Sequence, residues 1–174
     1  MGLPAAFSPA KLVCAVLLHD TLLLEKLTPR LRRDFGEIDF QSEPLAFDFT
    51  EYYRNEMGSG LLRVFFSFAT LMDPARLSEA KLATNQIEQE FSAAGARLVN
   101  VDPGLLFESR FVLATTKDYS HRIPLQDGIY AEVTLLYTQK QFRPLPWTYP
   151  DYRSSDYRRI LTIIRGLYRG ERKH

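Results

Sequence analysis

Acidic, basic and imidazole side chains gather in one short stretch of the second half of the chain. Lys117, Asp118, His121 and Arg122 follow closely on one another, and Glu132 comes ten residues after Arg122. Lysine and arginine bind carboxylates and phosphates, whereas imidazole and carboxylate groups serve as general acids and bases. The stretch therefore predicts either an anion site built on Lys117 and Arg122 or acid/base chemistry by His121 with Glu132 or Asp118.

The turn dipeptide Asp127-Gly128 joins two segments of strand-like pattern, residues 121–125 and 129–138. A two-residue loop would pair Ile123 with Glu132 and bring His121 diagonally close to that carboxylate, whereas a three-residue loop would change these partners. An ordinary exposed strand pair is the alternative interpretation. The residues expected to face the core are Ile129, Ala131, Val133, Leu135 and Tyr137.

A second concentration of polar and aromatic side chains follows at residues 147–153. Trp147 and Tyr149 are large aromatic residues, and Asp151 and Arg153 add opposite charges. Such a segment can form a stacking wall for a base or a sugar, in which case all four residues bind ligand. Alternatively, it fixes the last helix to the sheet, with Asp151 paired to Arg153.

Several standard catalytic and cofactor signatures are absent from the sequence. No P-loop, no G-x-G-x-x-G fingerprint and no G-x-S-x-G elbow occur. One cysteine and three histidines do not form a known zinc pattern, so we expect no metal and leave any cofactor unknown. A looser magnesium or manganese site of carboxylates and histidine stays open as a lesser alternative.

Composition sets the class of protein. The chain has 174 residues, of which 45% are hydrophobic and 25% are charged, so it can bury a core. Its formal net charge of +1 gives no overall electrostatic attraction to nucleic acid. Cys14 is the only cysteine, which favours a reducing compartment. The apolar run at residues 12–18 is too short to cross a membrane and predicts a buried strand. We expect a cytoplasmic protein without a membrane partner.

Strand and helix patterns alternate along the chain. Strands are expected at residues 12–18, 44–49, 61–71 and 97–101, with a polar connector at 51–60. Helices are expected from Asp20 or Thr21 to Gly36, kinked or restarted at Pro29, and from Asp73-Pro74 to Gly95 with Leu77, Ala80, Ile87 and Phe91 buried. A further helix is expected at 103–116, capped by Asp102, and a last one at 155–169 with Tyr157, Ile160, Leu161, Ile164 and Tyr168 buried.

This order predicts an α/β (α+β) fold with a mixed sheet. The first hundred residues follow a ferredoxin-like β-α-β-β-α-β pattern, which the helix at 103–116, the hairpin and the C-terminal helix extend. Residues 1–10 are expected to form a loose N-terminal arm, and residues 11–174 a single domain. Asn100 and Asp102 are expected in a turn and a helix cap.

Five ordered segments of the chain are distinctive: SEPLAFDFTEYYRNEMG (42–58), DPG (102–104), VLATTKDYSHR (112–122), DGIYAEVTLLY (127–137) and LPWTYPDYRS (145–154). Together they resemble domain-of-unknown-function family 4416, a group of small bacterial proteins. The resemblance implies no reaction or catalytic residue. Some members bear a label of GTP binding, but Thr116-Lys117-Asp118 lacks the spacing of the guanine-reading motif.

The leading hypothesis is a protein that binds a small anionic ligand, phosphorylated or nucleotide-like, in its second half. An enzyme acting on a phosphorylated substrate by acid/base chemistry is the first alternative. The second is an RNA-associated module, although a solvated basic helix is the simpler interpretation of the C-terminus. The oligomeric state is open. The basic residues of that region are Arg158, Arg159, Arg165, Arg169, Arg172 and Lys173.

Overall fold

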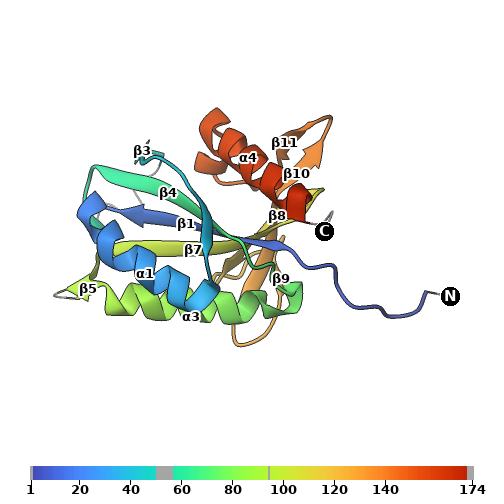
Figure 1. Cartoon of the computed structure of the whole chain (residues 1–174), viewed down its shortest axis with the longest axis horizontal. Coiled ribbons are helices and arrows are strands. Elements are labelled where there is room, and N and C mark those ends of the chain that lie inside the picture. The colour runs from blue at the N-terminus through green and yellow to red at the C-terminus, as the bar shows by residue number, and fades with distance from the viewer. Residues whose placement is uncertain (1, 50–56, 94, 172–174) are drawn as a thin grey trace.

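The computed structural model describes residues 2–49, 57–93 and 95–171. Its main feature is one large sheet (Figure 1), in which every recorded pairing is antiparallel. The strands of this sheet are β1 (Lys11–Leu18), β2 (Ile38–Gln41), β3 (Leu45–Phe47), β4 (Leu61–Phe68), β7 (Val99–Leu106), β8 (Arg110–Thr115), β9 (Ile123–Pro124), β10 (Tyr130–Thr138) and β11 (Gln141–Pro144).

The strand order is β11-β10-β8-β7-β1-β4-β2, with β3 also paired to β4 and β9 to β10. A separate small ribbon pairs β5 (Ser92–Ala93) with β6 (Ala96–Arg97). The α-helices of the described residues are α1 (Leu24–Phe35), α3 (Leu77–Glu90) and α4 (Ser155–Glu171). Short 3-10 helices are η1 (Thr21–Leu23), η2 (Pro74–Arg76) and η3 (Asp151–Arg153). The mixed α and β content confirms the expected α+β class. The expected mixed sheet is wrong, because every recorded strand pairing in the large sheet is antiparallel.

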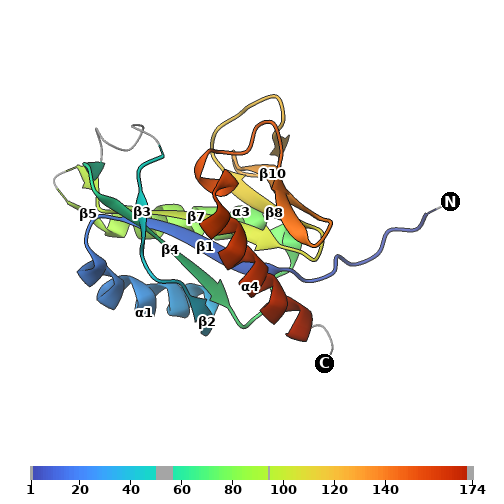
Figure 2. The same cartoon turned by 90° about the horizontal axis from the view of Figure 1, so that it is seen from above.

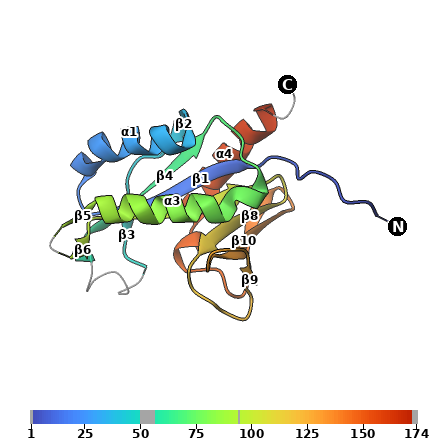
Figure 3. The ribbon, with the colours of Figure 1, turned by 90° about the horizontal axis from the view of Figure 1, so that it is seen from below.

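Strand β1 lies at the centre of the fold, and all eight of its residues are buried, which confirms the strand expected at 12–18. Its side chains alternate between two apolar cores, as strand geometry requires. Leu12, Cys14 and Val16 face the core that α1 and α3 cover (Figure 3). Val13 and Ala15 face the opposite core, which α4 covers (Figure 2).

Helix α1 follows the sequence signals closely. The side chain of Asp20 accepts a hydrogen bond from the Leu22 backbone N–H at 2.9 Å, and Gly36 at φ 90° ends the helix. Pro29 lies inside the continuous helix, so the proline does not restart it. Its apolar face buries Leu27 and Leu31.

Helix α3 begins as predicted and ends early. Asp73 caps the preceding 3-10 turn at Pro74, and the first helix residue, Leu77, is buried together with Ala80 and Ile87. The helix ends at Glu90 and not near Gly95, because the β5–β6 ribbon follows at once. Phe91, expected on the buried stripe, is the C-cap and only partly buried.

The helix expected at 103–116 is wrong. This stretch forms the second half of β7 and all of β8, which are joined as a hairpin. Strand β7 pairs with β1 over eight residues, so tertiary pairing overrides the local helix signal of Asp102-Pro103. Gly104 permits the hairpin, because a Cβ atom there would lie 2.6 Å from the Phe111 ring.

The β9–β10 hairpin has the expected turn but a different register. Asp127 and Gly128 have φ of 56° and 73°, as the dipeptide predicts. However, Ile123 pairs with Ala131 and not with Glu132. The backbone N–H of Leu125 donates to Ile129 O at 2.8 Å, which shifts the pairing by one residue.

A β-bulge also changes which residues of β10 share a face. The β8–β10 register shifts between Val133 and Leu135, so the extra residue Thr134 reverses the alternation. Val133 consequently packs against the core under α1 and α3, and Leu135 and Tyr137 against the core under α4. The single core face expected for this strand was therefore wrong beyond Val133.

Other boundaries differ by a few residues. The strand expected at 44–49 is reduced to β3, and the strand expected at 97–101 begins at Val99 and continues to Leu106. Strand β2 was not expected at all. Much of the connector at 51–60 lies outside the described residues, as do Arg172 and Lys173.

The C-terminal helix confirms its predicted amphipathic face. All five residues expected to be buried are buried: Tyr157, Ile160, Leu161, Ile164 and Tyr168. Residues 2–9 are exposed and lead away from the sheet (Figure 1). Among the described helices, none combines the length and apolar character that a membrane crossing needs.

Candidate functional site

A fork between β7 and β8 creates the candidate site. The two strands pair only from Gly104↔Leu113 to Leu106↔Phe111. Before Gly104 no pairing of β7 with β8 is recorded, and Pro103 has no backbone N–H to donate. The preceding part of β7 is thus an open edge, whose backbone groups require other partners.

Helix α3 supplies those partners at Val101. The backbone N–H of Val101 donates to Glu88 Oε1 at 2.8 Å, and Lys81 Nζ donates to Val101 O at 3.2 Å. Arg97 Nη1 donates to the other oxygen of Glu88 at 2.8 Å. Two nearly buried charged side chains of α3 therefore complete the open edge of β7 and hold the helix against it.

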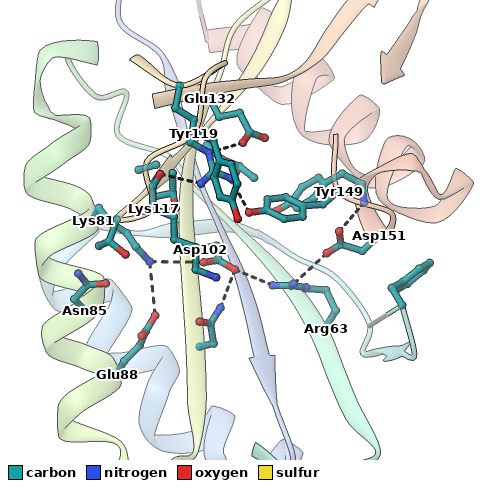
Figure 4. Close-up of a pocket in the computed structure, with 18 of the residues that line it drawn as sticks. Arg63, Lys81, Asn85, Glu88, Asp102, Lys117, Tyr119, Glu132, Tyr149 and Asp151 are labelled. Carbon is teal, nitrogen blue, oxygen red and sulfur yellow. Dashed lines mark hydrogen bonds and ion pairs between the residues drawn. The ribbon is translucent and has the colours of Figure 1, made fainter. Parts of the chain in front are cut away.

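The fork opens into a cavity of about 510 Å³ (Figure 4). Residues from α3, β3, β4, β6, β7, β8, β10 and η3 line it, together with residues of the loops after β3, β8 and β11. Its charged and amide side chains are Arg63, Lys81, Asn85, Glu88, Arg97, Asn100, Asp102, Lys117, Arg122, Glu132 and Asp151. Its aromatic side chains are Phe47, Phe49, Tyr119, Tyr149 and Tyr152.

Arg63 organises the buried side of the cavity. Its side chain is 2% exposed, and Nη2 donates to Asp151 Oδ2 at 3.2 Å. Nη1 donates to Ala15 O at 3.1 Å, and Nε donates to Tyr157 OH at 3.2 Å. Nη1 also lies 3.5 Å from Asp102 Oδ2. One guanidinium thus connects β4, β1, β7 and the turn before α4.

Asp102 lies between Lys81 and Arg63 (Figure 4). Its Oδ2 accepts a hydrogen bond from Asn100 Nδ2 at 2.7 Å, whereas its Oδ1 lies 3.6 Å from Lys81 Nζ. The Asp102 side chain is 25% exposed, and it lines the cavity. The helix cap expected of Asp102 is wrong, because the residue belongs to β7.

Arg122 organises the more exposed side. Nε donates to Glu132 Oε2 at 2.8 Å, Nη1 to Lys117 O at 2.8 Å, and Nη2 to Tyr149 OH at 2.7 Å. Its guanidinium also lies 4.7 Å from the ring centre of Tyr119. These contacts occupy three of the five N–H groups of an arginine and hold the loop after β8 in place.

His121 contacts the same carboxylate from outside the cavity lining. Its Nε2 lies 3.0 Å from Glu132 Oε2, the proximity that the sequence suggested despite the wrong register. The imidazole stacks on Trp147 with ring centres 5.1 Å apart and on Tyr119 at 6.1 Å. Trp147 donates through Nε1 to Val133 O at 2.9 Å, which fixes this stack to β10.

Burial shifts several pKa values beside Arg63. Burial raises the pKa of the Asp151 carboxyl, and the nearby Arg63 opposes that change only in part. Burial also raises the pKa of Tyr157 to about 12 and that of Tyr152 well above its usual range. The guanidinium stays charged, because the surrounding tyrosines and carboxylates outweigh burial and raise the pKa of Arg63.

Tyr152 carries an orphan polar atom. Its hydroxyl is buried and has no hydrogen-bond partner among the described residues. The ring packs edge-on to Phe65 and is stacked on Phe111, and the residue lines the cavity. A buried hydroxyl without a partner costs about 1–3 kcal/mol of stability.

The structure divides the residues that the sequence singled out. Lys117, Arg122, Glu132, Tyr149 and Asp151 line the cavity. Asp118, His121, Trp147 and Arg153 are absent from its lining.

The expected pairing of Asp151 with Arg153 is wrong. Asp151 pairs with Arg63, while Arg153 donates to Thr148 O and to Pro146 O at 2.8 Å each. Trp147 and Tyr149 also belong to separate contacts, the first to the stack on His121 and the second to Arg122. Residues 147–153 are therefore not one wall of one site.

Sequence reasoning missed the half of the cavity that the first hundred residues supply. Arg63 interrupts the apolar run of β4, and a charge inside such a run is a usable signal of a buried polar site. Lys81, Asn85 and Glu88 recur at spacings of four and three on α3, so they share one face beside the predicted apolar stripe. Only the position of β7 shows what that face meets.

A known protein family matches most of the chain. The family described as "Domain of unknown function (DUF4416)" matches residues 8–168. The chain belongs to this family. No curated protein and no solved structure matches it. Membership in the DUF4416 family therefore brings no described reaction to the cavity. Among the described residues, no group of three or more histidine, cysteine, aspartate or glutamate side chains is arranged to hold a metal ion.

Proposed function

We propose that the protein binds a small anionic ligand in the cavity at the β7–β8 fork. The cavity volume of about 510 Å³ falls in the range of small-molecule sites. Five of its lining side chains are basic and four are acidic, so the site retains an excess of positive charge. This concentration of cations around one concave site is the observation that carries the proposal.

The distribution of these charges supports an anion on the exposed side. Arg63 and Lys81 lie beside carboxylates at the buried side, whereas Lys117 is exposed and lines the opposite side of the cavity. Arg122 retains two N–H groups beyond its recorded bonds and is held rigidly by Glu132. A lysine and a preorganised arginine suit a phosphate or carboxylate group.

The test is a thermal-shift and calorimetric titration with inorganic phosphate, pyrophosphate and sulfate at low ionic strength. We expect at least one anion to raise the melting temperature, by about 5–10 °C at a hundredfold excess over Kd. Lys117→Gln should weaken binding, while Lys26→Gln, the same change on exposed α1, should not. No response to any anion, or equal loss in both variants, would contradict the proposal.

An enzyme acting on a phosphorylated substrate is a second proposal for the same cavity. Its support is the contact of His121 with Glu132, a carboxylate that lines the cavity. Phosphatase and phosphodiesterase assays with wild-type protein and His121→Gln test it. Activity that is unaltered in the variant would remove His121 from the chemistry.

RNA association is the weaker alternative. Its support is the basic character of α4, but Arg165 donates to Glu108 O at 2.7 Å and lies over Tyr137, and Arg158 donates to Ser154 O. Several of these cations are therefore already engaged within the chain. Filter binding to single-stranded RNA at low salt tests this proposal.

We also propose a ferredoxin-like core within a single domain of residues 11–174. The order β7-β1-β4-β2, with α1 and α3 on one face, supports this assignment. We further propose a bacterial, cytoplasmic protein. The unpaired and buried Cys14, whose pKa burial raises, suits a reducing compartment.

A further inference from the structure

We infer that the ligand carries hydroxyl groups in addition to its negative charge, as in a phosphorylated sugar or polyol. The inference rests on the proposed binding function and names the chemical class of its ligand. It comes from hydrogen-bonding capacity left unused at the buried side of the cavity, where Asp102, Lys81 and Asn85 lie (Figure 4).

Asp102 provides an unused acceptor. Oδ2 accepts from Asn100, but Oδ1 accepts no recorded hydrogen bond from the described residues. Its nearest recorded cation, Lys81 Nζ, lies 3.6 Å away, too far for a hydrogen bond. A fully deprotonated anionic group such as sulfate cannot bind this oxygen, since both groups are negatively charged and both can only accept hydrogen bonds. A ligand that fills the cavity must therefore bring a donor to it.

Lys81 provides unused donors at the same place. The ammonium donates to Val101 O at 3.2 Å, while its ion pairs with Asp102 and Glu88 are 3.6 and 3.8 Å long. An ammonium has three donors, so donors remain beside the free Asp102 oxygen. A hydroxyl can accept from Lys81 and donate to Asp102 at once. A ligand ammonium cannot accept, and Lys81 would repel it.

Asn85 extends this arrangement by one turn of α3. It lies four residues after Lys81 and hence on the same helix face. Its side chain is part-buried, lines the cavity and makes no recorded hydrogen bond to the described residues. An amide offers both donors and an acceptor. The acceptor of Asp102, the donors of Lys81 and the amide of Asn85 together suit neighbouring hydroxyl groups.

The two ends of the site then have different tasks. Lys117 and Arg122 on the exposed side face the anionic group, and the buried side selects for hydroxyls. Tyr119, which is 59% exposed, and Tyr149, which is 42% exposed, add ring surface to the exposed side of the cavity. Aromatic rings commonly pack against the apolar faces of a sugar or a planar ring.

The experiment compares phosphate esters that differ in their hydroxyl groups. Isothermal titration calorimetry measures glycerol 3-phosphate and ribose 5-phosphate against n-propyl phosphate, which has the same charged group and no hydroxyl. We expect the hydroxylated esters to bind at least about tenfold more tightly, the effect of one or two net hydrogen bonds. Equal affinities would overturn the inference and leave the anion-binding proposal standing.

Variants identify the residues responsible. Asn85→Ala and Asp102→Asn should each reduce the preference for the hydroxylated ester, with little change for propyl phosphate. Gln86→Ala, an exposed neighbour on α3, is the matched control and should leave the preference unchanged. A preference that survives both cavity variants would overturn the assignment of these residues.

Neutral ligands separate this inference from the proposed function. Titration with ribose and sorbitol tests binding at the buried, hydroxyl-selecting side of the cavity without an anionic group on the ligand. Binding of these polyols with no response to any phosphate would contradict the anion-binding proposal but support the hydroxyl site. Binding of the phosphate esters without any preference for the hydroxylated ones, and without binding of ribose or sorbitol, would do the reverse. No binding of any of these probes would contradict both.

Discussion

Lys81 and Glu88, whose charged groups lie 3.8 Å apart, bind the two backbone groups of the same residue, Val101. They occupy the place that a neighbouring strand would take along an open sheet edge. The same contacts keep β8 and β7 apart at this level, and the cavity occupies the resulting space. Stability and the candidate site therefore depend on the same helix face.

The first prediction concerns this edge. Glu88→Ala removes the acceptor of the Val101 N–H and the partner of Arg97, so we expect unfolding free energy to fall by about 2–4 kcal/mol. Urea denaturation measures the change. Glu79→Ala, which removes an exposed ion pair with Arg76 on the same helix, should change it by less than about 0.5 kcal/mol. If Glu88→Ala lowers the unfolding free energy no more than Glu79→Ala does, the edge contacts contribute little to stability.

The two buried tyrosines beside Arg63 make a matched pair. Tyr157→Phe removes a hydroxyl that accepts from Arg63 Nε, and we expect a loss of about 1 kcal/mol. Tyr152→Phe removes the orphan hydroxyl, and we expect no loss or a gain of up to about 1 kcal/mol. Chemical denaturation of both variants gives the comparison, which fails if Tyr152→Phe is the more destabilised.

A pH dependence follows from Asp151. Since burial raises the pKa of its carboxyl in the folded state, the folded protein holds this proton more tightly than the unfolded chain. The contribution to stability is fully present below the unfolded pKa of about 4, and it is lost as pH rises through the folded pKa. We expect wild-type stability, measured from pH 3.5 to 7, to decline relative to that of Asp151→Asn.

The exposed Asp156→Asn variant is the control for this titration. Its difference from wild-type should vary little over the same pH range. A stability difference between wild-type and Asp151→Asn that is constant with pH would show that Asp151 titrates normally. Direct observation of the Asp151 carboxyl by NMR would then have to give an ordinary pKa.

The β7–β8 hairpin depends on a glycine without positive φ. Gly104→Ala would place a Cβ atom 2.6 Å from Phe111 Cζ and 2.8 Å from Val112 O, so we expect a loss of about 1–3 kcal/mol. Gly166→Ala in α4 meets no atom within 4 Å and should stabilise the helix by about 0.5–1 kcal/mol. Thermal unfolding of the two variants should therefore move in opposite directions.

Local patterns in the sequence were sufficient for elements whose ends carry their own signals. Asp20 and Asp73 begin helical segments as capping residues, and Asp127-Gly128 forms the expected turn. The apolar stripe of α4 and the buried strand β1 also follow from periodicity. These features are decided by interactions between residues close in the chain, which the sequence displays directly.

Tertiary pairing decided the rest. Asp102-Pro103-Gly104 has the local chemistry of a helix start, but eight backbone pairs with β1 make it a strand. A three-residue loop at 126–128 and one extra residue at Thr134 shift the register, which no period-2 pattern records. The sequence by itself determined which residues of the second half carry charge near Glu132. Only the fold joined them to Arg63, Lys81 and Asp102, because strand pairing brings residues far apart in the chain to one open sheet edge.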